Sequence, residues 1–176
     1  MRTRDLTFCG LLAALTAVFA QILLFIPISP VPVNLAILIP LLSGRLLGIR
    51  RSVVSQMIYL LMGIIGLPVF AAMRGGVVIV VGPTGGYLLG YLLIALITGQ
   101  RKCFTKQTYM SECIIMSLAT LSCYVCGTIW FMLISGNGLF SSLALCVFPF
   151  IPGDVLKVLA GAYLVKKLRP IFKMWE

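Results

Sequence analysis

The stretch GPTGGYLLGYLLIALITG, residues 82–99, places a cluster of glycine and proline directly before a long apolar run. Glycine and proline commonly mark the start of a helix or the turn before it. A helix of roughly 20 mostly apolar residues is needed to cross the hydrocarbon core of a bilayer. The pattern therefore predicts a helix from about Pro83 to Gly99 that begins at one face of a membrane.

The composition of the whole chain agrees with a membrane location. Of its 176 residues, 61% are hydrophobic and 10% are charged, and the mean hydropathy is +1.13. An average soluble domain has roughly 25% charged residues. We therefore expect an integral membrane protein that forms a single domain over residues 1–176.

The apolar segments predict an all-α membrane protein with six transmembrane helices. The expected helices cover about 6–27, 33–49, 52–66, 83–99, 112–134 and 152–168. Two more apolar stretches, 67–82 and 139–151, do not fit simple spanning helices. Irregular backbone at membrane depth has to be buried in protein or line a cavity, so these stretches are expected to fold over one end of the bundle.

The basic residues support the same count. The chain carries 14 Lys and Arg against 4 Asp and Glu, a formal charge of +10. Twelve of the 14 fall on one side of a six-helix arrangement, which the positive-inside rule makes cytoplasmic. They are Arg2, Arg4, Arg45, Arg50, Arg51, Arg101, Lys102, Lys106, Lys166, Lys167, Arg169 and Lys173. We expect a multi-pass protein of the cell membrane with both termini in the cytoplasm, and Arg45 close enough to a helix end to reach the surface.

Several functions are disfavoured by what the chain lacks or how it is arranged. The basic residues form short groups between apolar runs, which argues against nucleic-acid binding. There is no histidine, and Cys123 and Cys126 have no second pair to complete a metal site. There is no nucleotide-binding G-x-x-x-x-G-K-[ST] motif. We expect no metal, no resident cofactor and no enzymatic activity, and a lipid-modifying membrane enzyme is a poorly supported alternative.

The glycine- and proline-rich segments converge on the outer end of the predicted bundle. They are PISPVPVN (27–34), GLPVF (66–70), GPTGGY (82–87) and PFIPGDVLK (149–157). The connections at the other end are short and basic. This asymmetry predicts irregular outer loops that close an outward-facing pocket.

Two charged residues are the strongest site candidates. Asp154 and Lys157 are three residues apart near the outer end of the last helix, so they share one helix face. Ionisable residues inside a membrane are functional candidates by default. The alternative is a helix-capping acid and a lysine that reaches toward the surface. Arg74 is the other basic residue that the cytoplasmic groups leave unexplained.

The start of the fourth helix offers backbone and hydroxyl groups. Gly85 and Gly86 would let a ligand approach the backbone closely, and Thr84 and Tyr87 would add hydroxyls. The alternative is that these residues only start a helix. In the first helix, Ala13 and Ala17 have the small-residue spacing that lets another helix approach, either from a partner or within the bundle.

In this order, PVP (30–32), GLPVFA (66–71), GPTGGYLLGY (82–91) and PGDVLK (152–157) resemble the BioY family. These proteins are the biotin-specific substrate-binding (S) subunits of energy-coupling factor (ECF) transporters. The resemblance covers nearly the whole chain. It implies six helices, a biotin pocket near the outer face, and a transmembrane coupling subunit with two ABC-type ATPases as partners, which would use the ATP. It also implies that Ala13 and Ala17 face the coupling subunit.

Biotin suits the site that the resemblance implies. Asp154 would accept from the ureido N–H groups, and Lys157 would donate to the ureido oxygen or the carboxylate. Arg74 or the amides at the start of the fourth helix would bind the carboxylate, and Phe70, Tyr87 and Trp130 would pack on the apolar body. After PVP the family usually has a residue followed by Thr-Leu-Gln, whereas this chain has Val33 and then Asn34, which would take over part of the glutamine's hydrogen bonding. A different small vitamin is therefore the alternative ligand.

Overall fold

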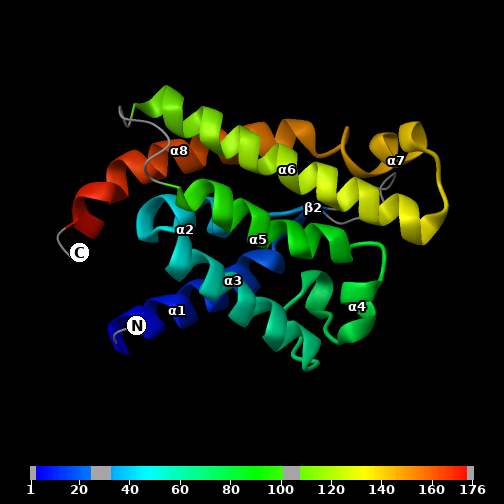
Figure 1. The fold of residues 1–176 in the computed structure, drawn as a ribbon, viewed down its shortest axis with the longest axis horizontal. Helices are drawn as coiled ribbons and strands as arrows, with labels where there is room; N and C mark the ends of the chain where they lie inside the picture. Colours follow the sequence, from blue (N-terminus) through cyan, green and yellow to red (C-terminus); the bar gives the residue numbers. More distant parts are fainter. Residues whose placement is uncertain (1–2, 25–32, 101–107, 174–176) are drawn as a thin grey trace.

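The computed structural model describes residues 3–24, 33–100 and 108–173, and helices dominate it (Figure 1). In chain order the elements are α1 (Thr3–Ala20), β1 (Leu23–Leu24), β2 (Val33–Asn34), α2 (Leu38–Leu47), α3 (Ile49–Ile64), the 3-10 helix η1 (Ala71–Met73), α4 (Val77–Val81), α5 (Gly85–Gly99), α6 (Tyr109–Ser135), α7 (Leu139–Cys146) and α8 (Ile151–Lys173). The strands form a two-residue antiparallel ribbon with Leu23 opposite Asn34. This ribbon is a small addition to the predicted all-α architecture.

Each of the six segments expected to be helical contains a helix, namely α1, α2, α3, α5, α6 and α8. The boundaries differ most around the first loop, because the β1–β2 ribbon replaces the predicted end of the first helix and start of the second. Residues 25–32, which include PVP, lie outside the described residues. Only Gly48 separates α2 from α3, and its φ of 82° belongs to the left-handed region that favours glycine.

The two apolar stretches outside these segments are short helices joined by irregular backbone. Residues 67–82 contain η1 and α4, and residues 139–151 contain α7. In Figure 1, α4 and α7 lie at one end of the long axis, and the start of α1 and the end of α8 lie toward the other. The prediction that these stretches gather at one end of the bundle is confirmed.

The described helices are shorter than a simple six-span count requires. Two of them, α1 and α6, are long and apolar enough to cross a membrane, and α7 with α8 adds a third if this pair, bent by 56°, is one span. α2 and α5 are apolar but have 10 and 15 residues. At about 1.5 Å per residue, neither reaches across a hydrocarbon core of about 30 Å. Length and composition therefore support fewer spans than the six predicted.

The core of the bundle forms around α5. This helix packs against α2, α3 and α6, while α1 packs on α3, and α8 packs on α2 and α6 (Figure 1). The buried side chains include many small ones, such as Ala13, Ala95, Ala119 and Ala162, all fully buried. Small residues let helix backbones approach closely, which is how helices associate when no water drives them together.

A buried ion cluster joins three helices at the end of the bundle near the termini. Arg45 in α2 donates from Nε to Glu112 Oε2 (2.5 Å) and from Nη2 to Oε1 (2.8 Å), and Arg169 in α8 also donates to Oε1 (2.8 Å). Arg45 and Glu112 are each 1% exposed. The expectation that Arg45 reaches the surface is wrong, because Glu112 in α6 supplies the charge that compensates it inside the protein.

Candidate functional site

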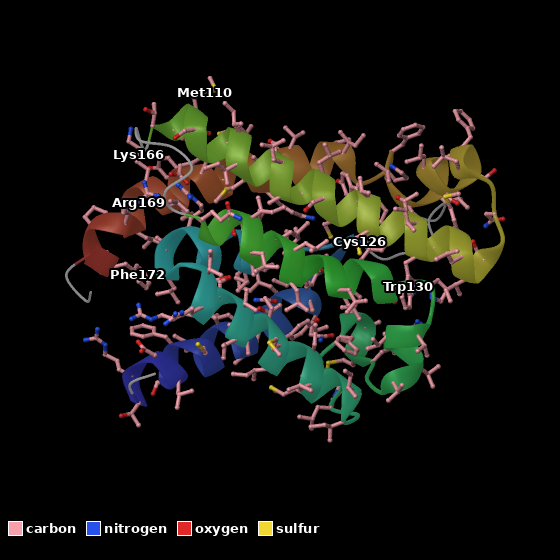
Figure 2. All side chains as sticks on the ribbon, viewed as in Figure 1. Met110, Cys126, Trp130, Lys166, Arg169 and Phe172 are labelled. Atoms are coloured by element: carbon pink, nitrogen blue, oxygen red, sulfur yellow. The ribbon has the colours of Figure 1, made fainter. Side chains whose placement is uncertain are left out.

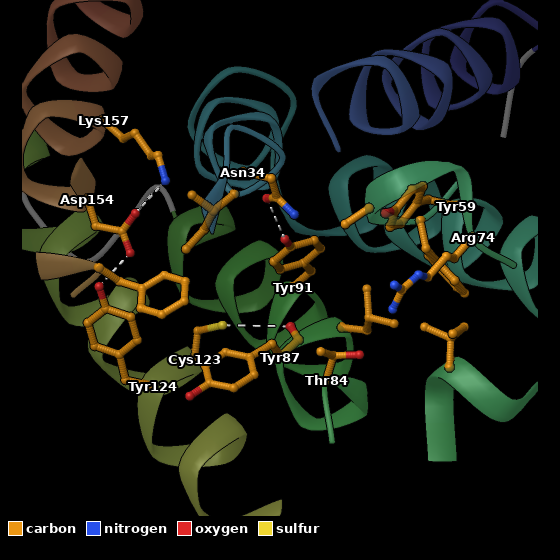
Figure 3. A pocket seen from close by; sticks show the side chains of 16 residues that line it. Asn34, Tyr59, Arg74, Thr84, Tyr87, Tyr91, Cys123, Tyr124, Asp154 and Lys157 are labelled. Carbon is orange, nitrogen blue, oxygen red and sulfur yellow. Dashed lines mark hydrogen bonds and ion pairs between the residues drawn. The ribbon is translucent and has the colours of Figure 1, made fainter. Parts of the chain in front are cut away.

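A cavity lies among α3, α5, α6, α8 and the loops that precede α2, α4 and α5 (Figure 3). It encloses about 860 Å³ of space not filled by protein atoms, part of it open to solvent. Its lining is mostly apolar and aromatic with a few polar groups, as is typical of sites for small molecules. Its lining residues are Asn34, Ile37, Tyr59, Phe70, Ala71, Arg74, Ile79, Thr84, Tyr87, Leu88, Tyr91, Cys123, Tyr124, Phe150, Asp154 and Lys157.

One side of the cavity carries a buried charge pair. Lys157 Nζ donates to Asp154 Oδ1 at 2.6 Å, within the first two turns of α8, and each residue is 6% exposed. The hydroxyl of Tyr124, from α6, donates to the other carboxylate oxygen, Oδ2, at 2.5 Å. Burial of charges is unfavourable unless they are paired and hydrogen-bonded, and this arrangement meets both conditions. The cavity therefore offers a carboxylate and an ammonium group to a ligand within an otherwise apolar wall.

A second polar group, the side-chain amide of Asn34, lies between the Asp154–Lys157 pair and the loops (Figure 3). Asn34 Oδ1 accepts from the hydroxyl of Tyr91 (3.3 Å) and from the backbone amide of Ala36 (3.1 Å). These two bonds fix the orientation of the Asn34 amide at the end of β2. Asn34 can therefore present a defined set of hydrogen-bonding groups to the cavity.

An aromatic wall continues from Tyr91 across the cavity. Tyr91 stacks on Tyr59, with ring centroids 6.4 Å apart, and Tyr59 and Phe70 form a T-shaped pair with ring centroids 5.6 Å apart. Phe70 lies against Gly63 in α3, where a Cβ would overlap the Phe70 ring. The backbone of α3 thus makes room for the ring, and the wall suits an apolar ligand body.

Arg74 lies on the far side of the cavity from Asp154 and Lys157 (Figure 3), and its side chain is exposed. Backbone bonds between Phe70 and Arg74 close the loop that carries both residues. A cationic group therefore lies on one side of a mostly apolar space, opposite the Asp154–Lys157 pair. Among the described residues, no cluster of three or more metal-ligating side chains occurs.

Comparison of the chain with known proteins identifies its family. The BioY family model matches residues 1–174. This chain belongs to the BioY family. A probable biotin transporter BioY from Pyrococcus horikoshii is 32% identical over 169 residues, covering 96% of this chain and 98% of the relative. The biotin transporter BioY of Rhizobium etli is 34% identical over 176 residues, covering 93% and 92% of the two chains.

A solved structure of similar fold agrees with this assignment. The crystal structure of the S-component for biotin from an ECF-type ABC transporter matches with a TM-score of 0.88 and 29% identity. The match covers 97% of this chain and 95% of the other. The predominantly helical architecture is therefore that of an S-component, and BioY family members are transporter components, not enzymes.

The structure gathers most of the BioY-type candidates around one cavity. Asp154, Lys157, Asn34, Phe70, Arg74, Thr84 and Tyr87 all line it. Gly85, Gly86 and Trp130 do not. The indole N–H of Trp130 donates to Gly82 O at 2.9 Å, and a Cβ on Gly86 would overlap Trp130 Cβ. Both glycines are buried, Gly85 against Val80 O of α4 and Gly86 against Trp130 of α6, so here they allow close packing and not approach of a ligand.

The two alanines of α1 point toward the rest of the chain. Ala13 is fully buried and Ala17 is half-buried against the hydrophobic core. Gly10 and Ala14 of this helix are exposed and are also four residues apart. In the isolated chain Ala13 is therefore a packing residue, because α3 covers that face of α1.

Sequence reasoning missed the tyrosines that complete the cavity. Tyr59, Tyr91 and Tyr124 line it together with Phe150. Tyr91 follows Tyr87 by four residues and so shares its helix face, and this spacing could have predicted that Tyr91 lines the cavity. Tyr59 and Tyr124 lie in helices whose orientation around their own axes only packing reveals.

Proposed function

We propose that this chain binds biotin in the cavity and acts as the S subunit of an ECF-type vitamin uptake transporter. The observation that carries the proposal is a buried Asp–Lys pair that faces an aromatic-walled cavity. The relatives are named as biotin transporters, and the matched structure as an S-component for biotin. A ligand with a polar ring, an apolar body and an anionic end fits this distribution of groups.

The ureido ring of biotin is the group proposed to meet the buried pair. It has two N–H donors and one carbonyl acceptor. The Asp154 carboxylate is an acceptor for N–H groups, and the Lys157 ammonium is a donor to the carbonyl oxygen. Asn34, whose amide is held by Tyr91, adds a neutral hydrogen-bonding group near the same ring. Charge-assisted hydrogen bonds of this kind are stronger than neutral ones.

The rest of the ligand is proposed to extend toward Arg74. The sulfur ring would pack on the aromatic wall of Phe70, Tyr59 and Tyr91. The chain would end with its carboxylate near the Arg74 guanidinium, which can bind a carboxylate through two parallel hydrogen bonds. This orientation leaves the charged tail on the exposed side of the cavity, where desolvation is least unfavourable.

The cavity is proposed to face outward, with six membrane crossings and both termini in the cytoplasm. In Figure 1 the start of α1 and the end of α8 lie toward one end of the long axis, and α4 and α7 lie at the opposite end. The described basic residues of the cytoplasmic groups belong to the start of α1, the α2–α3 junction and the end of α8. Crossings shorter than about 20 residues would require local thinning of the bilayer or flanking residues that extend to the interface.

The partners are proposed to be a transmembrane coupling subunit and two ABC-type ATPases, which would supply the ATP hydrolysis. The proposed contact surface is the exposed side of α1. Gly10 and Ala14 have no bulky side chain there, and a Cβ on Gly10 would meet no heavy atom within 4 Å. Ala17 is half-buried at the border of this surface, and Ala13 is buried on the opposite side of the helix.

Equilibrium binding of biotin to the purified chain tests the proposal. We expect saturable binding without chemical conversion of biotin, and competition only by molecules that keep the ureido ring. Competition by an unrelated vitamin of equal strength would favour the alternative ligand. Absence of binding by a folded preparation would contradict the proposed function.

A further inference from the structure

Gln21, in the turn after α1, contacts the segment that carries three of the cavity's lining residues. Its side-chain nitrogen lies within hydrogen-bond distance of Phe70 O (3.0 Å) and Val69 O (3.3 Å). Its side-chain oxygen accepts from the backbone amide of Met73 at 2.9 Å. The same nitrogen is 3.2 Å from Ala17 O, so the amide joins α1 to the segment.

The segment that Gln21 contacts contains an unfavourable backbone conformation. Ala72 has φ 60° and Met73 has φ 55°, both in the left-handed region that residues other than glycine rarely adopt. Two backbone bonds between Phe70 and Arg74, of 2.9 and 3.3 Å, close the turn. Such a conformation persists only where the surroundings hold it, and Met73 N is one of the groups that Gln21 holds.

This turn determines what the cavity presents on its exposed side. Ala71 and Arg74 flank the two left-handed residues, and both line the cavity. Phe70 is held separately by Gly63 and Tyr59, and it is 1% exposed. The positions of Ala71 and Arg74 therefore depend on the turn more than the position of Phe70 does.

We propose that Gln21 is a positioning residue that keeps residues 69–74 in their ligand-facing shape and ties this turn to α1. The proposal rests on the proposed function for the identity of the ligand. Without the amide, the turn can leave its left-handed conformation. Arg74 and Ala71 then no longer contact the bound ligand. Such a change acts mainly on the dissociation rate, which carries most affinity differences among variants of one site.

The test compares Gln21→Met with Gln56→Met in the full-length chain. Methionine keeps the length of the side chain and removes its hydrogen bonds. Gln56 is the matched control because it is buried and links α3 to α1 through Thr16, with its nitrogen 3.4 Å from Thr16 Oγ1. The measurements are the dissociation rate of biotin and the amide hydrogen exchange of peptides covering residues 67–76.

For Gln21→Met we expect dissociation about tenfold faster and faster exchange in residues 67–76, with α6 unchanged. Gln21→Glu keeps the acceptor for Met73 N but places a carboxylate oxygen against the carbonyls of Ala17, Val69 and Phe70, so it should not restore the parental values. Gln56→Met should behave as the parent protein in both measurements.

The proposal is overturned if Gln21→Met leaves both quantities unchanged, or if Gln56→Met changes them equally. If the parent protein does not bind biotin, the proposed function fails and hydrogen exchange alone decides the role of Gln21.

Discussion

Asp154 receives hydrogen bonds from two helices, through Lys157 in α8 and Tyr124 in α6. Each carboxylate oxygen thus has one donor inside the protein, and each has lone pairs left for a ligand. Loss of one member of a buried pair leaves the other charge uncompensated, which is strongly unfavourable. At the scale of residues, this pair shapes one side of the cavity, and it is the group proposed to meet the polar ring of the ligand.

Replacement of either member of the pair should weaken biotin binding. Asp154→Asn keeps the shape and removes the charge, and hydrogen bonds to charged groups contribute roughly 1.5–3 kcal/mol. We expect affinity to fall about ten- to a hundredfold, since 1.4 kcal/mol corresponds to a factor of ten. Lys157→Met should weaken binding as well, as measured by equilibrium titration.

Lys166→Met is the matched control for this prediction, because Lys166 is an exposed lysine of the same helix. It should leave the affinity unchanged. Near-parental affinity in both Asp154→Asn and Lys157→Met would mean that the pair only starts and stabilises α8.

At the scale of elements, α5 is placed by its glycines. Gly86, Gly90 and Gly99 are buried where neighbouring helices approach, and a Cβ on each would meet Trp130, Cys123 and Ile49 respectively. Glycine within a helix is about 0.5–1 kcal/mol less favourable than alanine. The close packing of α5 against α6 offsets that loss, and it brings Tyr87 and Tyr91 to the cavity.

Gly86→Ala should therefore destabilise the protein, although alanine is the better helix former. Overpacking of a well-packed core typically costs about 1–3 kcal/mol, so the thermal unfolding midpoint of the purified protein should fall. Gly153→Ala in α8 is the control, because a Cβ there meets no heavy atom within 4 Å. An equal or smaller loss for Gly86→Ala than for Gly153→Ala would refute the packing role.

The exposed side of α1 gives a second prediction at this scale. Gly10→Trp combined with Ala14→Trp should block assembly with the coupling subunit and leave biotin binding intact, because both positions are exposed. Leu118→Trp on the exposed side of α6 is the control and should assemble normally. Co-purification of the coupling subunit is the measurement. Normal assembly of the α1 double variant would exclude this surface.

At the scale of the whole molecule, the two ends differ in chemistry. One end has the Arg45–Glu112–Arg169 cluster and the exposed lysines of α8. The irregular elements α4 and α7 lie at the opposite end (Figure 1), and the labelled side chains of Figure 2 show Lys166 and Arg169 far from Trp130. The positive-inside rule predicts that the basic end faces the cytoplasm.

Single cysteines should reveal this orientation. In a cysteine-free background, Asn137→Cys should react with a membrane-impermeant reagent in intact cells, whereas Lys166→Cys should react only after permeabilisation. Both residues are exposed, so accessibility within the protein does not decide the result. Labelling of both positions in intact cells would contradict a cytoplasmic C-terminus.

The sequence by itself determined the apolar runs, their helices and the partition of basic residues, because hydropathy and charge act on each segment separately. It also determined that Asp154 and Lys157 share a face, because three residues make nearly one helical turn. The sequence predicted the helix boundaries less accurately around the first loop. There, pairing of Leu23 with Asn34 replaces helix, and this pairing depends on segments that meet in space.

Only the tertiary structure decided how side chains from different helices combine. Tyr124 reaches Asp154 across 30 residues, and Glu112 pairs with Arg45 across 67. Helix packing also places Gly86 against Trp130 and not at the cavity. Each of these outcomes depends on the rotation and spacing of packed helices, which follow from the combined volumes of many side chains and leave no periodic signal in one segment.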